Sequence, residues 1–329
     1  MEAYLRSLRK LSLALAAAIL AGSPVPGVAQ GASAYPAKPI KYVVPFPPGG
    51  LTDLMARNVG QKLNEAWKQP VVVENRPGGN AQIGAEAVAK AAGDGYTLLA
   101  VTLTHAVNAT LFPDAPYKLQ KDLAPVAVLG SLPLLVVVPA GSPVKSLADL
   151  AQLAQQKSLN GGSSGNGTPP HLGLELYKSL TRAKIEHVPY KGGAPSLTDL
   201  IGGQLDVIFA NLPEALPHVK SGKLRALAVT SKARHALLPD VPTAAEAGVP
   251  QLEITNWTGV MVPASTPPAI VAKLNAELGR ILADPEMRKR IAEQGFEPAT
   301  QGVPETRAFV AAEVDRWGKL VKSANIRAD

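Results

Sequence analysis

Residues 43–53, VVPFPPGGLTD, lead from a β-branched run through a break of prolines and glycines into an apolar helical pattern. Prolines cannot extend a strand's hydrogen-bond ladder, whereas Gly49 and Gly50 allow positive φ angles and a close approach of a ligand to the backbone. The first N–H groups of the following helix lack intrahelical partners and lie at the positive end of the helix dipole. The stretch therefore predicts an anion site beyond the end of a strand.

A second glycine-rich stretch, GGSSGNGTP at residues 161–169, has the same character. Thr168 stands at the N-cap position of an apolar-periodic helix, and Pro169 stands at its first helical position. A third turn, at Gly192 and Gly193, also leads into a helical pattern. A chain of 329 residues exceeds the usual single domain. We therefore expect two lobes, each presenting a helix N-terminus to one ligand.

Short apolar runs alternate with helical periodicity from residue 40 onward, which predicts an α/β fold with a mostly parallel sheet in each lobe. Two runs at residues 125–130 and 134–138 predict separate strands near the crossing into the second lobe. Residues 102–108 predict a loop at a strand's carboxyl end, where open α/β sheets bind ligands. The predicted domains are a signal peptide at 1–34, lobe 1 at 35–131 plus 230–329, and lobe 2 at 132–229. The return crossing could instead lie at residues 257–262.

The composition is mildly basic, with 33 Lys plus Arg against 26 Asp plus Glu. These charges are interspersed and no run of five basic residues occurs, so we expect no nucleic-acid partner. Aromatic residues make up only 5%, which argues against sugars, whose sites rely on aromatic faces. The absence of cysteine excludes disulfides and lipid attachment through a thiol.

The N-terminus carries three basic residues, an apolar run at 11–21 and then small residues. This order is typical of a cleaved secretory signal peptide, and the apolar run is too short to span a bilayer. We prefer cleavage after Ala34, with Ala29 as the alternative, and expect an exported protein in the periplasm. A membrane anchor is the lesser alternative.

The strongest enzyme motif is G-x-S-x-G at residues 161–165, which makes a serine hydrolase using Ser163 the alternative function. Its context is weak, because residues 157–160 predict a poor strand and the helix begins several residues later. His105 lies in the predicted ligand-facing loop, although a loop residue without ligand contact is the stronger interpretation. No histidine pair has metal-site spacing, and neither a phosphate loop nor a dinucleotide fingerprint occurs. We therefore expect no cofactor, no metal and no catalytic residue.

Six motifs in order resemble the tripartite tricarboxylate transporter receptors, the Bug-type periplasmic solute-binding proteins. The resemblance covers essentially the whole mature chain. The motifs are PFPPGGxxDxxAR at 45–57, VENRPGG at 73–79, DGYTL at 94–98, GNGT at 165–168, HVPYKG at 187–192 and LRALAVT at 224–230.

The resemblance implies a type II periplasmic-binding-protein-like fold of two α/β lobes that close on a small organic carboxylate and hand it to membrane permease subunits. It also implies that loop backbone and ordered waters grip the ligand, without catalysis, and we expect a monomer. The alternative in the same class is a signalling receptor without a transport role. The implied ligand-binding residues are Phe46, Pro48, Gly49, Gly50, Thr52, Asp53, Thr104, Ser163, Ser164, Asn166, Gly167, Thr168, Lys191, Gly192, Gly193, Asp206 and Asn211.

Two departures from the family pattern affect the expected site. Gly161 and Gly162 replace an aromatic residue that often precedes the second turn, which changes the wall of the cleft and leaves the ligand's identity open. Pro47 and Pro48 replace two alanines in the first loop, which should stiffen that turn.

Overall fold

The computed structural model describes residues 35–299 and 301–327, so the predicted signal peptide lies outside the described residues. The strands are β1 (Ile40–Val44), β2 (Val71–Asn75), β3 (Thr97–Thr102), β4 (Leu123–Pro139), β5 (Leu159–Ser163), β6 (Ile185–Pro189), β7 (Val207–Asn211), β8 (Leu224–Val229), β9 (Thr255–Pro263) and β10 (Glu297–Pro298). The helices are α2 (Leu51–Trp67), α3 (Gln82–Ala89), α4 (Leu103–Leu111), α5 (Leu119–Asp122), α6 (Leu147–Gln156), α7 (Pro169–Thr181), α8 (Gly193–Ile201), α9 (Leu212–Lys220), α10 (Pro268–Ala283), α11 (Pro285–Glu293) and α12 (Val303–Ser323).

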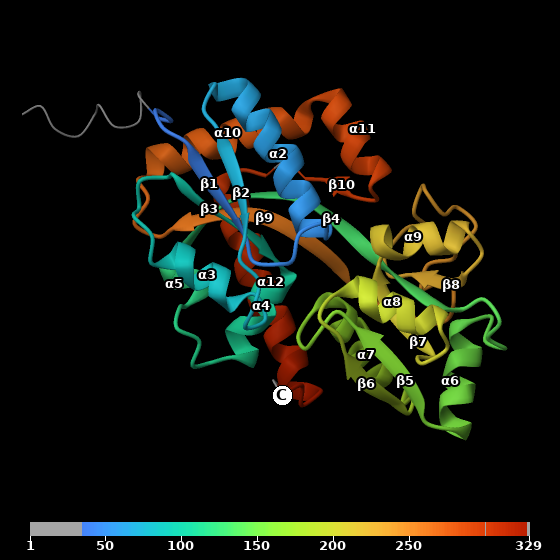
Figure 1. Ribbon diagram of the computed structural model, residues 1–329. Helices are drawn as coiled ribbons and strands as arrows, with labels where there is room; N and C mark the ends of the chain where they lie inside the picture. Colours follow the sequence, from blue (N-terminus) through green and yellow to red (C-terminus); the bar gives the residue numbers. More distant parts are fainter. Residues whose placement is uncertain (1–34, 300, 328–329) are drawn as a thin grey trace, which may run out of the picture. The chain divides into compact units, whose positions relative to one another are not determined.

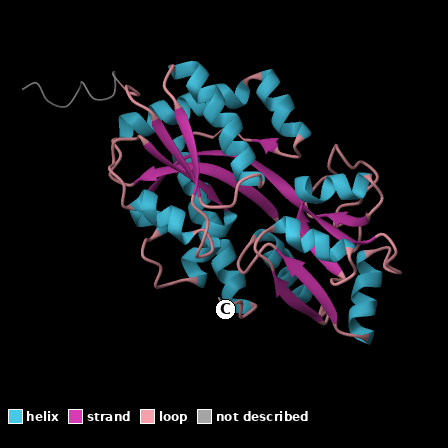
Figure 2. Cartoon of the chain, in the orientation of Figure 1, coloured by secondary structure: helices cyan, strands magenta, loops and turns pink. Residues whose placement is uncertain are grey.

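The strands form a mixed sheet in the order β2-β1-β3-β9-β4-β7-β5-β6, with β8 and β10 also paired to β4. Strands at the two ends of this order pair in parallel, whereas every pairing of β4 and β9 is antiparallel. Helices flank the strands (Figure 2). The fold is therefore α/β as predicted, but antiparallel pairing is more extensive than the expected mostly parallel sheet.

Strand β4 joins the two ends of the sheet (Figure 1). It is one strand of 17 residues, not the two separate strands predicted from its apolar runs. Residues 123–133 pair with β9, and residues 134–137 pair with β7. The β1 half denotes β1, β2, β3, β9 and β10 with the loops and helices that follow them, and the β5 half denotes β5 to β8 with theirs. Residues 36–329 cluster as one compact unit, so the lobe boundaries stay a prediction.

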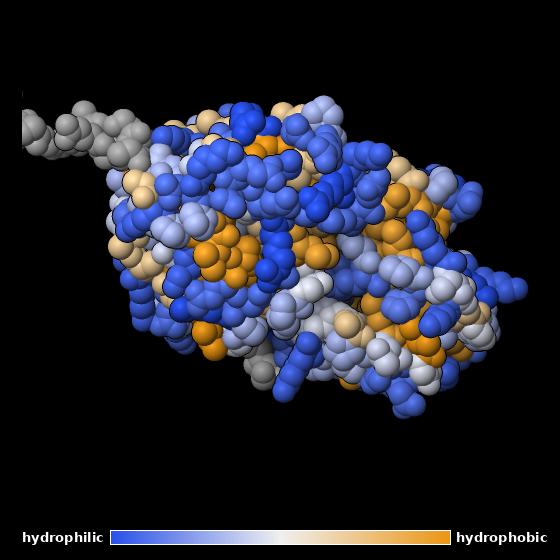
Figure 3. Space-filling model, turned by 45° about the horizontal axis from the view of Figure 1, so that its top comes forward, coloured by the Kyte–Doolittle hydropathy of each residue, from blue (hydrophilic) through white to orange (hydrophobic). Residues whose placement is uncertain are grey.

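The core explains where the elements sit. Along α2, Met55, Val59 and Leu63 are fully buried, as their spacing predicts, whereas Leu54 is 39% exposed and does not share that face. Strand β2 lies at the edge of the sheet, and Val72 is 56% exposed, so it is not the buried strand that its three valines predicted. Figure 3 shows apolar side chains on one face as separate patches between hydrophilic ones.

Two helices differ from the sequence predictions. Residues 103–111, most of which were expected to form a loop, are helix α4, so Thr104 and His105 lie in a helical first turn. Helix α9 was not predicted, because Pro213 and Pro217 disfavour a helix; Pro213 falls in the first turn, where its missing N–H costs nothing. Within residues 35–299 and 301–327, no helix combines the length and apolarity required to cross a membrane.

Candidate functional site

The loop after β1 is held by the carboxylate of Asp53. Its Oδ2 accepts hydrogen bonds from Gly49 N–H and Arg57 Nε, each at 2.9 Å, and its Oδ1 accepts from Asn75 Nδ2 at 2.9 Å. Asn75 Nδ2 also donates to the carbonyl of Phe46 at 3.1 Å. Burial works to raise the pKa of Asp53, but these hydrogen bonds and the Arg57 charge outweigh it and the pKa is lowered. Asp53 therefore remains ionised and fixes residues 46–53 around the N-terminus of α2.

The N-terminus of α4 presents a buried neutral histidine beside this loop. His105 is fully buried, and its Nδ1 accepts the Thr102 N–H at 3.1 Å. Burial lowers the pKa of His105 to about 4, so the ring is neutral at pH 7 and its proton resides on Nε2. This Nε2 has no hydrogen-bond partner among the described residues. The ring stands edge-on to Phe46 at 6.2 Å between centroids, which holds the loop after β1 against the first turn of α4.

The loop at residues 163–168 is braced by two stacked histidines. The hydroxyl of Ser163 lies 2.6 Å from His187 Nε2 and accepts the Gly165 N–H at 3.0 Å. The rings of His187 and His171 stack at 3.7 Å, and His171 Nδ1 accepts the Gly167 N–H at 3.0 Å. Burial, with the neighbouring His187 and the charge of Lys178, lowers the pKa of His171 to about 3, so the His171 ring is neutral at pH 7.

Helix α7, which follows this loop, is a poorer anion site than the sequence suggested. Pro169 and Pro170 occupy its first two positions and carry no N–H. Thr168 does not cap the helix with its side chain; its hydroxyl donates to the carbonyl of Gly165 at 2.7 Å. The contribution of this turn to a ligand therefore comes from loop atoms, including the buried Oδ1 of Asn166, which has no partner among the described residues.

The two halves of the sheet touch at Gly167. A Cβ built on this glycine would lie 2.6 Å from Leu111 Cδ2 and 3.3 Å from Asn80 Nδ2, both in the β1 half. Asn80 Nδ2 in turn donates to Asn108 Oδ1 of α4 at 2.9 Å. Gly167 has φ +68°, which an L side chain adopts with difficulty, so both the conformation and the close approach require glycine here.

A chain of three polar side chains lies where β7 and β9 meet β4. Asn256 Nδ2 donates to Asn211 Oδ1 at 3.0 Å, and Asn211 Nδ2 donates to Glu214 Oε2 at 3.3 Å. The Glu214 carboxyl lies against the start of α8, with Oε2 only 2.1 Å from where a Cβ on Gly193 would stand. Burial raises the pKa of Glu214 to about 7, and the Asn211 hydrogen bond acts in the opposite direction.

The structure brings most of the predicted site residues to this region but separates two from it. Asp206 precedes β7 at the end opposite Asn211, where its carboxylate accepts the Asn160 N–H at 2.8 Å and lies 3.7 Å from Lys157 Nζ. Lys191 is exposed, whereas Gly192 is the N-cap of α8 and Gly193, its first residue, packs against the Glu214 carboxyl. The structure adds four residues to the predicted site. His105 was already considered as a ligand-facing residue from the sequence. For Asn75, Glu214 and Asn256, no sequence motif around the residue indicates a role in the site, because strands far apart in the sequence bring them there.

Some structural features around Ser163 agree with a serine hydrolase, and others oppose it. The strand judged poor from its sequence does exist as β5, and a histidine does contact Ser163. However, Ser163 is fully buried and its hydroxyl is engaged with Gly165, so a substrate carbonyl has no approach. Gly161 and Gly162 serve packing, because a Cβ would lie 2.7 Å from Leu174 Cδ2 at the first and 2.5 Å from Leu205 Cδ1 at the second.

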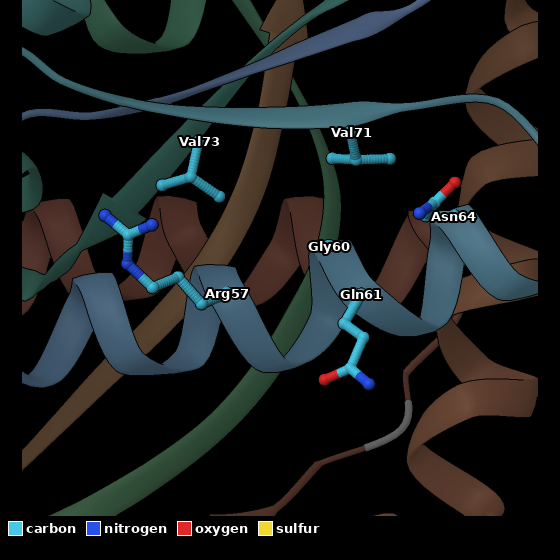
Figure 4. A pocket seen from close by; sticks show the side chains of 6 residues that line it. All are labelled: Arg57, Gly60, Gln61, Asn64, Val71 and Val73. Atoms are coloured by element: carbon cyan, nitrogen blue, oxygen red, sulfur yellow. The ribbon is translucent and has the colours of Figure 1, made fainter.

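A shallow groove of about 310 Å³ lies elsewhere, between α2 and β2. Figure 4 shows its lining side chains, which are Arg57, Gly60, Gln61, Asn64, Val71 and Val73. None of the predicted site residues lines it, and it sits beside the middle of α2 rather than its N-terminus. Within the part of the chain that the structure describes, no cluster of three His, Asp or Glu side chains could hold a metal ion.

Comparisons with known proteins point to one family. The model of the tripartite tricarboxylate transporter family receptor matches residues 55–326. Protein BugT of Bordetella pertussis is 40% identical over 309 residues, covering 92% of this chain and 94% of that protein. An R. palustris protein solved with adipate is 38% identical with a TM-score of 0.85, covering 89% of this chain and 99% of that one. MatC from Rhodopseudomonas palustris with bound malate is 33% identical with a TM-score of 0.81, covering 87% and 100%.

Proposed function

Because the chain belongs to the tripartite tricarboxylate transporter receptor family, we propose that it binds a small organic carboxylate where the loops of the two halves of its sheet meet and delivers it to a membrane transporter. The observation that carries this proposal is the Asp53-braced loop, which presents the N-terminus of α2 beside the first turn of α4. The proposed location is the periplasm, reached through the signal peptide predicted at residues 1–34.

The family consists of substrate-binding receptors, so the chain is not an enzyme and the hydrolase based on Ser163 is excluded. Relatives solved with adipate and malate support a carboxylate as the ligand here. The signalling receptor remains the alternative to transport. Capture of integral transporter subunits from membranes by the ligand-loaded protein favours transport, whereas capture of a sensor kinase favours signalling.

Neutral hydrogen-bond donors can hold the proposed carboxylate. The first N–H groups of α2 and α4 have no intrahelical acceptors and carry the positive end of each helix dipole. His105 Nε2 adds a buried donor without a partner among the described residues. Thr52 and Thr104, both buried, belong to these same two first turns. Such donors bind an anion without a permanent counter-charge, which suits capture followed by release.

A thermal-shift screen tests the proposed ligand class. An organic acid present at 100 times its dissociation constant should stabilise the folded protein by about 2.7 kcal/mol and raise Tm by roughly 5 °C or more. Neutral sugars of similar size serve as the control and should leave Tm unchanged. The proposal fails if sugars raise Tm and no organic acid does.

Gly167→Ala tests the contact between the two halves. The added methyl would meet Leu111 at a left-handed backbone position, so we expect the halves to be pushed apart and the affinity for the acid to fall roughly tenfold. Gly203→Ala is the matched control, because φ is +78° there and nothing lies within 4 Å of a Cβ. Both variants should lose about 1 kcal/mol of stability to backbone strain, and calorimetric titration should show weaker binding only for Gly167→Ala. Equal affinities would contradict the contact's role.

A further inference from the structure

The polar chain Asn256–Asn211–Glu214 ends in a buried acceptor. Asn256 is 4% exposed and Asn211 is 6% exposed, so both amides are nearly withdrawn from solvent. Asn256 Oδ1 has no hydrogen-bond partner among the described residues. A buried polar atom without a partner destabilises the folded protein, so a ligand that supplies the missing hydrogen bond gains affinity from it.

The hydrogen-bond pattern fixes which atom of Asn256 remains unpaired. The amide nitrogen of Asn211 faces Glu214 and donates to its Oε2 at 3.3 Å. The Asn211 oxygen then faces Asn256 and accepts a hydrogen bond from the Asn256 amide nitrogen. The remaining atom of Asn256 is therefore an oxygen, and only a donor can satisfy it.

This acceptor adjoins the proposed carboxylate site. Asn256 is two residues before Thr258 in β9, and Thr258 pairs with Thr102, the residue directly before α4. Asn256 is also bonded to Asn211, which ends β7 directly before α9. Asn256 is thus connected through β9 to the strand residue that precedes α4, and through Asn211 to the Glu214 carboxyl at the start of α8.

Resting on the proposed function, we propose that the site selects a carboxylic acid that carries a second group with a hydrogen-bond donor, a hydroxyl or an ammonium, which donates to Asn256 Oδ1. The carboxylate binds the donors of the β1 half, and the donor group binds the Asn256 end of the chain. A plain dicarboxylate of the same length leaves the buried oxygen unsatisfied. Glu214, which is hydrogen-bonded to Asn211, carries a negative charge in its ionised form, and that charge favours an ammonium over a hydroxyl.

The test is a calorimetric comparison of matched acids with the full mature protein, freed of bound ligand by unfolding and refolding. The sets are propionate, lactate and alanine; succinate, malate and aspartate; glutarate, 2-hydroxyglutarate and glutamate; and adipate with 2-aminoadipate. Within the best-bound set, the hydroxy or amino acid should bind roughly tenfold or more tightly than the plain acid. If the amino acid binds better than the plain acid and this advantage decreases in the Glu214→Gln variant, the donor group is an ammonium. If the advantage of the donor-bearing acid is the same in the variant and the wild type, the donor group is a hydroxyl.

Two variants connect this preference to Asn256. In Asn256→Leu, which has similar volume and no acceptor, the preference should disappear while the plain acid still binds. In Asn256→Asp, which retains an acceptor oxygen, the preference should persist. The inference is overturned if plain acids bind as tightly as their donor-bearing partners, or if the leucine variant retains the preference. If the leucine variant does not fold, the wild-type comparison alone decides. If no acid of any set binds, the proposed function itself fails.

Discussion

Replacing Asp53 with alanine is expected to abolish carboxylate binding and to lower the free energy of unfolding by about 3 kcal/mol. The side chain is 2% exposed and accepts three hydrogen bonds, from Gly49 N–H, Arg57 and Asn75. Its loss releases the loop at residues 46–53, removes the acceptor of the Gly49 N–H, and leaves Asn75 Nδ2 with only the Phe46 carbonyl. Because Arg57 is half exposed and Gly49 is exposed, water compensates much of their share, and most of the cost comes from the released loop and the weakened bonding of Asn75. Urea denaturation and calorimetric titration measure the two effects.

The control for this variant is Glu65→Gln, an exposed carboxylate near the other end of α2, which should change neither stability nor affinity. The pH dependence supplies an independent check. The pKa of Asp53 is depressed in the folded state, so its contribution is fully present above the ordinary value of 3.8 and is lost as the pH falls through the lower folded pKa. Wild-type protein should therefore lose stability below pH 4 more steeply than Asp53→Ala. Tight binding by the alanine variant would show that the loop does not hold the ligand.

The first strand and its helix could be predicted closely because local chemistry decides them. The prolines and glycines at residues 45–50 end β1 and start α2 whatever surrounds them, and Pro268 begins α10 by the same local rule, as a proline in the first turn. By contrast, β5 contains Gly161 and Gly162, which have no preference for strands. It forms because β6 and β7 pair with it and because Leu174 and Leu205 leave no room for larger side chains.

The contact between Asn211 and Asn256 in the candidate site could not be predicted for a related reason. Asn211 follows a strand and was visible as a candidate, but Asn256 lies 45 residues away along the chain and meets it only through the antiparallel pairing of β9 and β7 with β4. The histidine brace of the 163–168 loop also joins separate segments, since His171 belongs to α7 and His187 to β6. Asp206 was predicted to lie in the site but does not. A polar residue next to a strand can lie at either end of that strand, and the hydrogen bond from Asn160 N–H shows that Asp206 lies at the end away from the site.

The Glu313→Ala change should lower the free energy of unfolding by about 4 kcal/mol, because one buried carboxylate oxygen serves two tryptophans. Glu313 Oε2 accepts the indole N–H of Trp257 and that of Trp317, each at 2.9 Å, and the residue is 8% exposed. Without it, two buried donors lose their partner at about 1–3 kcal/mol each, and a cavity is added. Trp257 is adjacent to Asn256 in β9 and points to the opposite side of the strand, so the same change should also weaken ligand binding.

Glu313→Gln separates the acceptor from the charge. A single amide oxygen has two lone pairs and can accept both indoles, so the glutamine variant should lose only about 1 kcal/mol in chemical denaturation. Asp315→Asn on the same helix breaks an exposed pair with Lys319 and should be nearly neutral, at most about 0.5 kcal/mol. If glutamine proves as damaging as alanine, the charge rather than the shared oxygen holds β9 against α12. If glutamine retains both stability and affinity, one neutral acceptor behind Trp257 is sufficient to keep Asn256 in position.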